Sequence, residues 1–395
     1  MLLPELSLPS PSARLKTLAA STLLAAAATG TLQAQSPGLT LPPSGGNQKG
    51  SILQQIGPVE VRIDYSSPDV TGPGGQDRRG QIWGQLVPYG LTNLGFGNGN
   101  PGPWRAGANE NTVFTVSHDV EVEGKPLAAG TYGLHMIADE KEWTIIFSKN
   151  ASSWGSFFYD PAEDALRVTV RPEKAEYREW LTYDALDRQP TSAKLALHWE
   201  ELRVPFEVSV PEANDIYLTQ IREDLRGSAG FTWQNWNAAA QFCLTTGHEL
   251  EQGLAFAESA ISAPFVGQEN FTTLQTKAAL LNALSRPAEA KVALDKAARH
   301  PTAGPQQVHT LARTLQGQGM TALAVELFLL NAERFGEGWP MNVGLARAHS
   351  AQGDFKKALK YARAAHEDAP DPLNKGNLEK VIEILESGRD FNATN

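Results

Sequence analysis

The hydrophobic pattern of this 395-residue chain changes period once, near Pro211. Before that point, apolar and polar residues alternate in short segments such as 59–66 (VEVRIDYS), and alternation is typical of half-buried β-strands. After it, apolar residues recur at i, i+3, i+4 and i+7, as in 322–335, which indicates amphipathic helices. The chain also exceeds the length of one typical core. We therefore expect an α+β multidomain protein, with an antiparallel β-sandwich over 51–210 and an all-α domain over 211–390.

The helical half repeats itself. Gly319 and Gly353 lie 34 residues apart (353 − 319), which is the length of a tetratricopeptide hairpin. A similar helix in 285–301 begins about 33 residues before Gly319, and 245–261 gives a less regular copy. Residues 377–388 are expected to form a closing cap helix. Because a two-helix unit cannot bury its apolar face alone, the copies should stack as tetratricopeptide-like repeats and bind a protein partner. An unrelated helical bundle is the alternative.

The charge balance excludes some partners. The chain holds 34 Lys and Arg against 44 Asp and Glu, a formal net charge of −10. A nucleic-acid-binding protein needs a basic face, and anionic membranes repel an acidic chain. We therefore predict no nucleic-acid partner. Cys243 is the single cysteine, so no intramolecular disulfide forms, and its apolar helical context favours a buried thiol.

The N-terminus resembles a secretory signal. Arg14 and Lys16 precede the charge-free segment 17–32, and Ala34 offers a small residue at a cleavage point. We predict a signal peptide over residues 1–34 and a Pro-, Gly- and Ser-rich linker over residues 35–50. The alternative, a retained membrane anchor, needs a longer and more apolar run. The mature protein should therefore be periplasmic or secreted, with no membrane span after cleavage.

Six segments of the first half, in the same order, resemble a bacterial exported family catalogued as domain of unknown function 2911. They are 49–70 (KGSILQQIGPVEVRIDYSSPDV), 82–90 (IWGQLVPYG), 104–112 (WRAGANENT), 120–137 (VEVEGKPLAAGTYGLHMI), 142–160 (EWTIIFSKNASSWGSFFYD) and 165–172 (ALRVTVRP). In this chain residues 91–103 lengthen the loop that precedes the third segment. The resemblance implies an exported β-domain and brings no settled activity with it.

The first candidate site is the loop that enters the strand pattern at 111–117. Trp104, Arg105, Asn109 and Glu110 lie close together there. A guanidinium and an amide can bind a carboxylate or sugar hydroxyls, and an indole can stack on a sugar. We therefore predict a small polar ligand at these four residues. In the structural alternative, Arg105 pairs with Glu110 or with loop carbonyls, and Trp104 plugs the end of the sandwich.

The sequence offers two further kinds of candidate site. His118 and His135 on adjacent strands are candidate metal ligands, although no H-x-H or HExxH spacing occurs. The aromatic residues around 154–159 form either a binding lip or part of the core. A G-x-S-x-G nucleophile elbow is missing from the sequence, and no cofactor is predicted.

These observations favour an exported, non-enzymatic binding or adaptor protein. Its sandwich would hold a small polar ligand or an extended segment, and its repeats would bind a protein. Two alternatives stay open. One is a cell-envelope, glycan or peptide hydrolase in which Glu110 acts as acid or base and Arg105 orients the substrate. The other is a metal-binding module.

Overall fold

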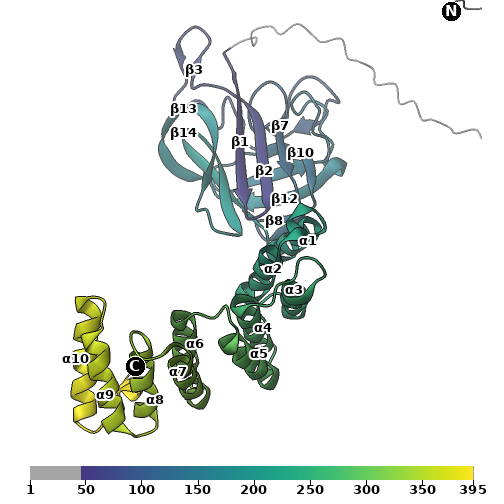
Figure 1. The fold of residues 1–395 in the computed structure, drawn as a ribbon. Coiled ribbons are helices and arrows are strands. Elements are labelled where there is room, and N and C mark those ends of the chain that lie inside the picture. Colours follow the sequence, from purple (N-terminus) through teal and green to yellow (C-terminus); the bar gives the residue numbers. More distant parts are fainter. Residues whose placement is uncertain (1–45, 395) are drawn as a thin grey trace, which may run out of the picture. The chain divides into compact units, whose positions relative to one another are not determined.

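The computed structural model describes residues 46–394 (Figure 1). The predicted signal peptide over 1–34 and most of the predicted linker lie outside the described residues. The described chain contains a sheet-rich part followed by helices, as the change of period near Pro211 predicts.

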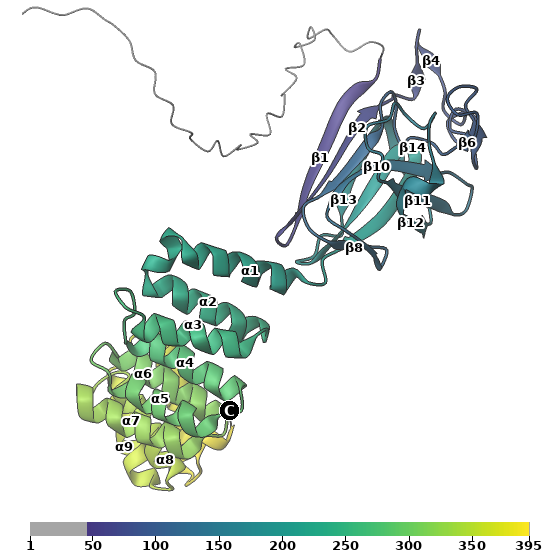
Figure 2. The same cartoon turned by 90° about the vertical axis from the view of Figure 1, so that its right-hand side faces the viewer.

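The sheet-rich part contains two antiparallel sheets (Figures 1 and 2). The first consists, in spatial order, of β1 (Gln48–Ile56), β2 (Val59–Ser67), β7 (Thr112–Val116), β10 (Gly130–Ile137), β11 (Trp143–Ser148) and β12 (Asp164–Val170). The second consists of β13 (Glu173–Leu186), β14 (Ser192–Ser209), β8 (Val120–Val122) and β9 (Lys125–Leu127). Two short antiparallel strand pairs lie outside these two sheets. They are β3 (Thr71–Gly72) with β4 (Gln76–Asp77), and β5 (Thr92–Asn93) with β6 (Pro101–Gly102).

The two sheets share one hydrophobic core. Phe114 of β7 and Phe147 of β11 both contact Phe206 of β14, with ring centroids 6.5 and 6.1 Å apart. All three side chains are fully buried. Strand alternation directs these rings inward while the intervening residues face the opposite side. The predicted antiparallel β-sandwich is confirmed.

Strand lengths differ from the sequence-based expectation in two places. The alternating segments 194–200 and 204–210 both belong to the single long strand β14, which continues through Glu200 at a φ of 54°. The strand β1 begins at Gln48, inside the segment predicted as a linker. Between Asp69 and Asn100 the chain forms mainly loops with two-residue strands, as its many glycines predict.

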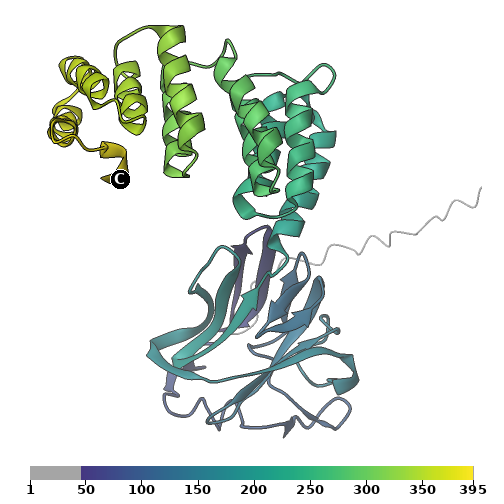
Figure 3. The same ribbon diagram turned by 90° about the horizontal axis from the view of Figure 1, so that it is seen from below.

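Ten helices follow in the described residues, and consecutive helices pair as hairpins (Figure 3). They are α1 (Ala213–Arg226), α2 (Trp233–Thr246), α3 (Leu250–Ser262), α4 (Phe271–Ala283), α5 (Pro287–Arg299), α6 (Pro305–Gly317), α7 (Thr321–Phe335), α8 (Met341–Ala351), α9 (Phe355–Glu367) and α10 (Pro372–Glu386). One buried cluster runs from Leu218 to Ala348 across successive hairpins. Stacking therefore buries the apolar face that a single hairpin leaves open.

The turns within the hairpins repeat in register. Gly319 joins α6 to α7 with φ of 78°, and Gly353 joins α8 to α9 with φ of 79°. The turn between α4 and α5 places Ser285 at the same position with φ of 60°. The spacings are equal (319 − 285 = 34 and 353 − 319 = 34). The repeat length inferred from the two glycines is confirmed, and it extends to a third hairpin.

These turns give a first testable prediction. A left-handed conformation costs a non-glycine residue roughly 1–2 kcal/mol. We expect Gly353→Ala to lower the free energy of unfolding by about 1 kcal/mol, and Ser285→Gly to raise it by up to about 1 kcal/mol. Added at Gly353, a Cβ meets nothing within 4 Å, so backbone strain alone causes the loss. Urea denaturation measures both changes.

A helical glycine provides the matched control. Gly376 lies inside α10, and a Cβ there also meets nothing within 4 Å. Because alanine favours helix by about 1 kcal/mol over glycine, Gly376→Ala should stabilise the protein. Equal effects of alanine at 353 and at 376 would contradict the role assigned to the turn.

Candidate functional site

Trp104 of the predicted ligand site is partly buried and packs against the core of the sandwich. Its backbone N–H donates to the carbonyl of Met136, and the N–H of Met136 donates back, both at 2.8 Å. Its indole lies 6.0, 6.3 and 6.4 Å from those of Trp83, Trp143 and Trp199. Trp143 and Trp199 are fully buried. The indole therefore belongs to a four-tryptophan cluster, which is the geometry of the structural alternative.

Arg105 is half-buried and bonds to its own loop. Nη1 donates to the carbonyl of Asn109 at 2.5 Å, and Cζ lies 5.1 Å from the centre of the Phe157 ring. Among the described residues, no carboxylate lies within 4.0 Å of the guanidinium. Burial lowers the pKa of Arg105. The side chain thus meets a loop carbonyl and an aromatic face, and it does not pair with Glu110.

Asn109 and Glu110 turn toward the first two strands. Glu110 Oε2 lies 2.7 Å from Lys49 Nζ and accepts from Ser66 Oγ at 3.0 Å. The ammonium of Lys49 lowers the pKa of Glu110. Asn109 Oδ1 accepts from Asn47 Nδ2 at 3.0 Å. These contacts tie the start of β1 to the loop.

The four predicted site residues therefore do not converge. Trp104 enters the core, Arg105 lies on Phe157, and Glu110 faces β1 and β2. Acid–base hydrolysis needs titratable groups that face one cavity. The hydrolase alternative built on Glu110 and Arg105 lacks that geometry.

His135 is buried in β10. Its Nδ1 lies 2.9 Å from Ser156 Oγ, and Ser156 is also buried. Burial, reinforced by the positive charge of Arg105, lowers the pKa of His135 to about 4. The imidazole is therefore neutral at physiological pH and serves as a hydrogen-bonding core residue.

His118 lies at the other end of the same strand pair. In the β7–β10 register, Val116 faces Gly130 and Thr112 faces Leu134. By that register His135 aligns with residue 111, seven residues before His118, which is roughly 23 Å of extended chain. One ion cannot bind both. The predicted metal site is therefore corrected, and the described residues contain no group of three or more potential metal ligands.

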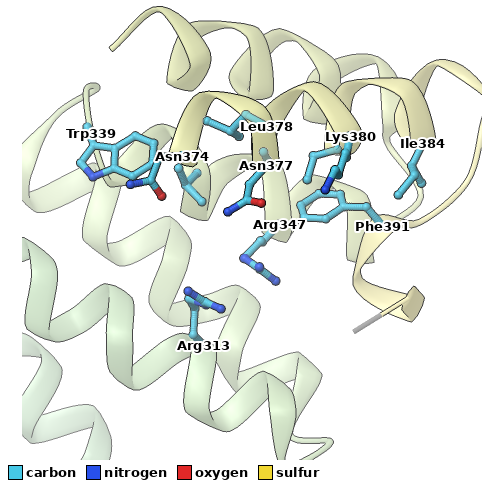
Figure 4. Close-up of a pocket in the computed structure, with 12 residues that line it drawn as sticks. Arg313, Trp339, Arg347, Asn374, Asn377, Leu378, Lys380, Ile384 and Phe391 are labelled. Atoms are coloured by element: carbon cyan, nitrogen blue, oxygen red, sulfur yellow. The ribbon is translucent and has the colours of Figure 1, made fainter. Parts of the chain in front are cut away.

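The helical domain holds a feature that the sequence analysis missed. Two adjoining cavities of about 510 Å³ each lie among α6, α8 and α10, and both are lined by Arg313, Trp339, Val343 and Asn374. Figure 4 shows the first of them, which Arg347 also lines. We call the combined space the repeat groove. Its walls come mainly from α6, α8 and α10, with Trp339 from the α7–α8 loop and Phe391 from beyond α10, so only the stacked repeats create it.

The repeat groove is basic although the chain is acidic. Its lining includes Arg313 of α6, Arg347 of α8 and Lys380 of α10, with no Asp or Glu. Within the part of the chain that the structure describes, no carboxylate lies within 4.0 Å of any of these three cations. The positions follow the repeat (347 − 313 = 34 and 380 − 347 = 33). Basic residues at the repeat spacing are the signal that could have found this site.

Arg347 lies deepest of the three. Its Nη1 donates to Gln316 Oε1 at 3.1 Å and to Asn392 Oδ1 at 3.2 Å, and its Cζ lies 5.4 Å from the centre of the Phe391 ring. Its Nε is buried and has no partner among the described residues. Burial and the neighbouring Arg313 lower the pKa of Arg347 to about 10. Asp390 offsets only part of this lowering, and its carboxylate is not within 4.0 Å of the guanidinium.

The remaining walls of the repeat groove combine apolar and neutral polar side chains. Apolar side chains come mainly from α10, and Trp339 stands beside Asn374 (Figure 4). Asn377 has no hydrogen-bond partner within the described range and is exposed. An apolar wall, free amide groups and unpaired cations together can hold an extended chain that carries a carboxylate.

The fold defines the class of protein: an antiparallel β-sandwich followed by stacked helical hairpins. Residues 47–208 match the family model described as "Protein of unknown function (DUF2911)". The match spans the sandwich and ends before α1, and it confirms the resemblance drawn from the six sequence segments.

Solved structures resemble part of the chain. One is YrrB, a TPR protein with an unusual peptide-binding site, at 17% identity and a TM-score of 0.30, covering 42% of this chain and 84% of that one. Another is pilF of Pseudomonas aeruginosa, at 15% identity and a TM-score of 0.28, covering 42% and 78%. No curated protein matches the chain. In the described range, every helix is too short or too polar to cross a bilayer.

Proposed function

We propose that the helical domain binds an acidic, extended segment of a protein partner in the repeat groove. One observation carries this proposal: Arg313, Arg347 and Lys380 line a single groove, and none has a carboxylate partner among the described residues. In a chain with a net charge of −10, such a local excess of positive charge selects an anionic ligand.

The depth of Arg347 favours a carboxylate over a diffuse anionic surface. A guanidinium binds a carboxylate through two parallel hydrogen bonds, and this geometry is more specific than a point charge. The partly buried position weakens solvent screening, which strengthens the attraction. Arg313 lies nearby and repels Arg347 in the free protein. An incoming carboxylate would relieve that repulsion.

The rest of the repeat groove suits a peptide. A volume of about 510 Å³ in each cavity lies within the range of ligand pockets. The wall of Leu378, Val381 and Ile384 would take apolar side chains. Asn377 has the amide donor and acceptor that an extended backbone requires. The partner is therefore expected to alternate acidic and apolar residues.

We also propose that the protein is exported from the cytoplasm. The segment 17–32 and the basic residues before it support secretion to the periplasm or beyond. There the protein would act as a non-enzymatic adaptor. N-terminal sequencing of protein from the envelope fraction checks this point, because a start near residue 35 is expected and an intact Met1 would contradict it.

A peptide-binding experiment tests the repeat groove. The probes are a fluorescent decapeptide of alternating Glu and Val and its Gln counterpart, measured by fluorescence anisotropy on the full chain. We expect the Gln peptide to bind roughly tenfold more weakly. The Arg313→Glu variant should bind the Glu peptide more weakly than the unchanged protein does, to a similar degree. Higher salt should weaken this binding too.

The matched control is Lys356→Glu. Lys356 is an exposed lysine of α9 outside the cavity lining, so the same charge change is made away from the repeat groove. Arg313 is exposed, has no hydrogen-bond or ion-pair partner within the described residues, and repels Arg347, so its replacement should not lower the melting temperature. Equal binding of both peptides, or equal losses in both variants, would refute the proposal.

A further inference from the structure

The sandwich presents aromatic side chains to solvent at one loop cluster. Phe96, Trp154 and Phe158 are 66%, 58% and 54% exposed. Phe96 packs edge-on against both Phe157 and Phe158, with ring centroids 5.5 and 6.0 Å apart. Trp154 stands four residues before Phe158, which keeps their Cα atoms within roughly 14 Å. We call Phe96, Trp154, Phe157 and Phe158 the aromatic face.

The aromatic face is held firmly. Asn98 donates from its backbone N–H to the carbonyl of Phe157 at 3.2 Å and from Nδ2 to the carbonyl of Tyr159 at 3.1 Å. A Cβ added at Gly97 would lie 1.9 Å from that Phe157 oxygen, so only glycine allows the two loops to approach. The guanidinium of Arg105 supports the Phe157 ring. The Phe96, Phe157 and Phe158 rings, which pack on one another, therefore lose little conformational freedom when a ligand stacks on them.

The two loops of the aromatic face carry no charged side chain of their own, and the cation that contacts them, Arg105, is half-buried against Phe157. Residues 88–103 and 150–159 contain no Asp, Glu, Lys or Arg, although 20% of the chain is charged. Asn100 and Ser152 are exposed, and their side-chain amide and hydroxyl groups have no partner in the described structure. Exposed rings therefore alternate with free neutral hydrogen-bonding groups.

We propose that the aromatic face binds a neutral saccharide chain. Sugar rings have apolar C–H faces that stack on aromatic rings, while their hydroxyl groups hydrogen-bond to amides and hydroxyls. A lipid surface is disfavoured because membrane-binding aromatic clusters carry exposed Lys or Arg beside them, whereas Arg105 is half-buried here. A charged partner is disfavoured because these loops carry no complementary charge. The inference concerns the sandwich alone and is independent of the repeat groove.

Affinity electrophoresis of the full chain tests this inference. The gels contain dextran, xylan or a soluble β-1,3-glucan, and we expect at least one of them to retard the protein. Trp154→Ala and Phe158→Ala should each lower the affinity for the retarding polysaccharide by roughly tenfold. Raising the salt concentration should change nothing, because no charge takes part.

A distant aromatic residue serves as the control. Phe265 lies between α3 and α4 and is fully exposed, so Phe265→Ala removes a similar surface without touching the sandwich. Trp154 and Phe158 are exposed, and melting temperatures should confirm that their variants stay folded. Three outcomes overturn the inference: no retardation by any glucan or xylan, equal effects of Trp154→Ala and Phe265→Ala, or co-sedimentation with phosphatidylcholine vesicles that Trp154→Ala abolishes.

Discussion

Replacing Trp104 by alanine is expected to lower the free energy of unfolding of the sandwich by about 3–5 kcal/mol. The indole contacts Trp83, Trp143 and Trp199 at ring distances of 6.0 to 6.4 Å. Alanine removes these contacts and leaves a cavity that fixed strands cannot close. Hydrogen exchange of the β7 and β10 amides measures the loss, because it reports on the sandwich separately from the helices.

Trp154→Ala is the matched control for this experiment. It removes the same side chain from an exposed position, 58% open to solvent, so the sandwich should lose less than about 1 kcal/mol. A comparable loss in both variants would contradict the account of the tryptophan cluster. It would also return Trp104 to the set of possible ligand contacts.

The second large effect is a loss of stability in mild acid. His135 in the sandwich and His309 in α6 are buried, and burial lowers the pKa of each to about 4. Part of this lowering comes from the positive charge of Arg105 at His135 and from those of Arg313 and Arg347 at His309. Because the unfolded chain titrates near 6.5, it binds protons before the folded chain does. The free energy of unfolding should fall between pH 6.5 and 4, by about 3 kcal/mol for each histidine.

Thermal melts between pH 4 and pH 7.5 measure this loss. The stabilising contribution is complete above pH 6.5 and disappears as the pH approaches 4. His135→Gln and His309→Gln should each flatten the dependence of the melting temperature on pH, one for each domain. His118→Gln, at an exposed position, is the control. An unchanged slope in both buried-site variants would show that carboxylates alone cause the acid sensitivity.

The secondary structure could be predicted from the sequence because its signals are local. Alternation at 59–66 marks β2, and the helical pattern at 322–335 marks α7. Gly319 and Gly353 set the repeat length because a turn between two helices requires a left-handed residue there. Ser285 occupies the same position without being a glycine, so the third hairpin was harder to align.

The candidate site was only partly predictable, because its members come together through packing. Trp104 and Arg105 are neighbours in the sequence, yet their side chains have different partners. The Trp104 indole packs on Trp199, whereas the Arg105 guanidinium lies against the Phe157 ring. The sequence leaves two roles open for the aromatic segment near Trp154, a binding lip or a part of the core. Its partner Phe96 joins it only because two loops distant in the sequence meet.

Local sequence patterns were sufficient to predict the period of each half, the repeat length and the resemblance of residues 47–208 to one family. These depend on backbone geometry and on residues close together along the chain. The tertiary structure alone decided that His118 and His135 lie at opposite ends of a strand pair, and that Arg313, Arg347 and Lys380 line one groove. Strand register and helix stacking set those distances. Both arise from contacts between residues that are far apart along the chain, which no local pattern encodes.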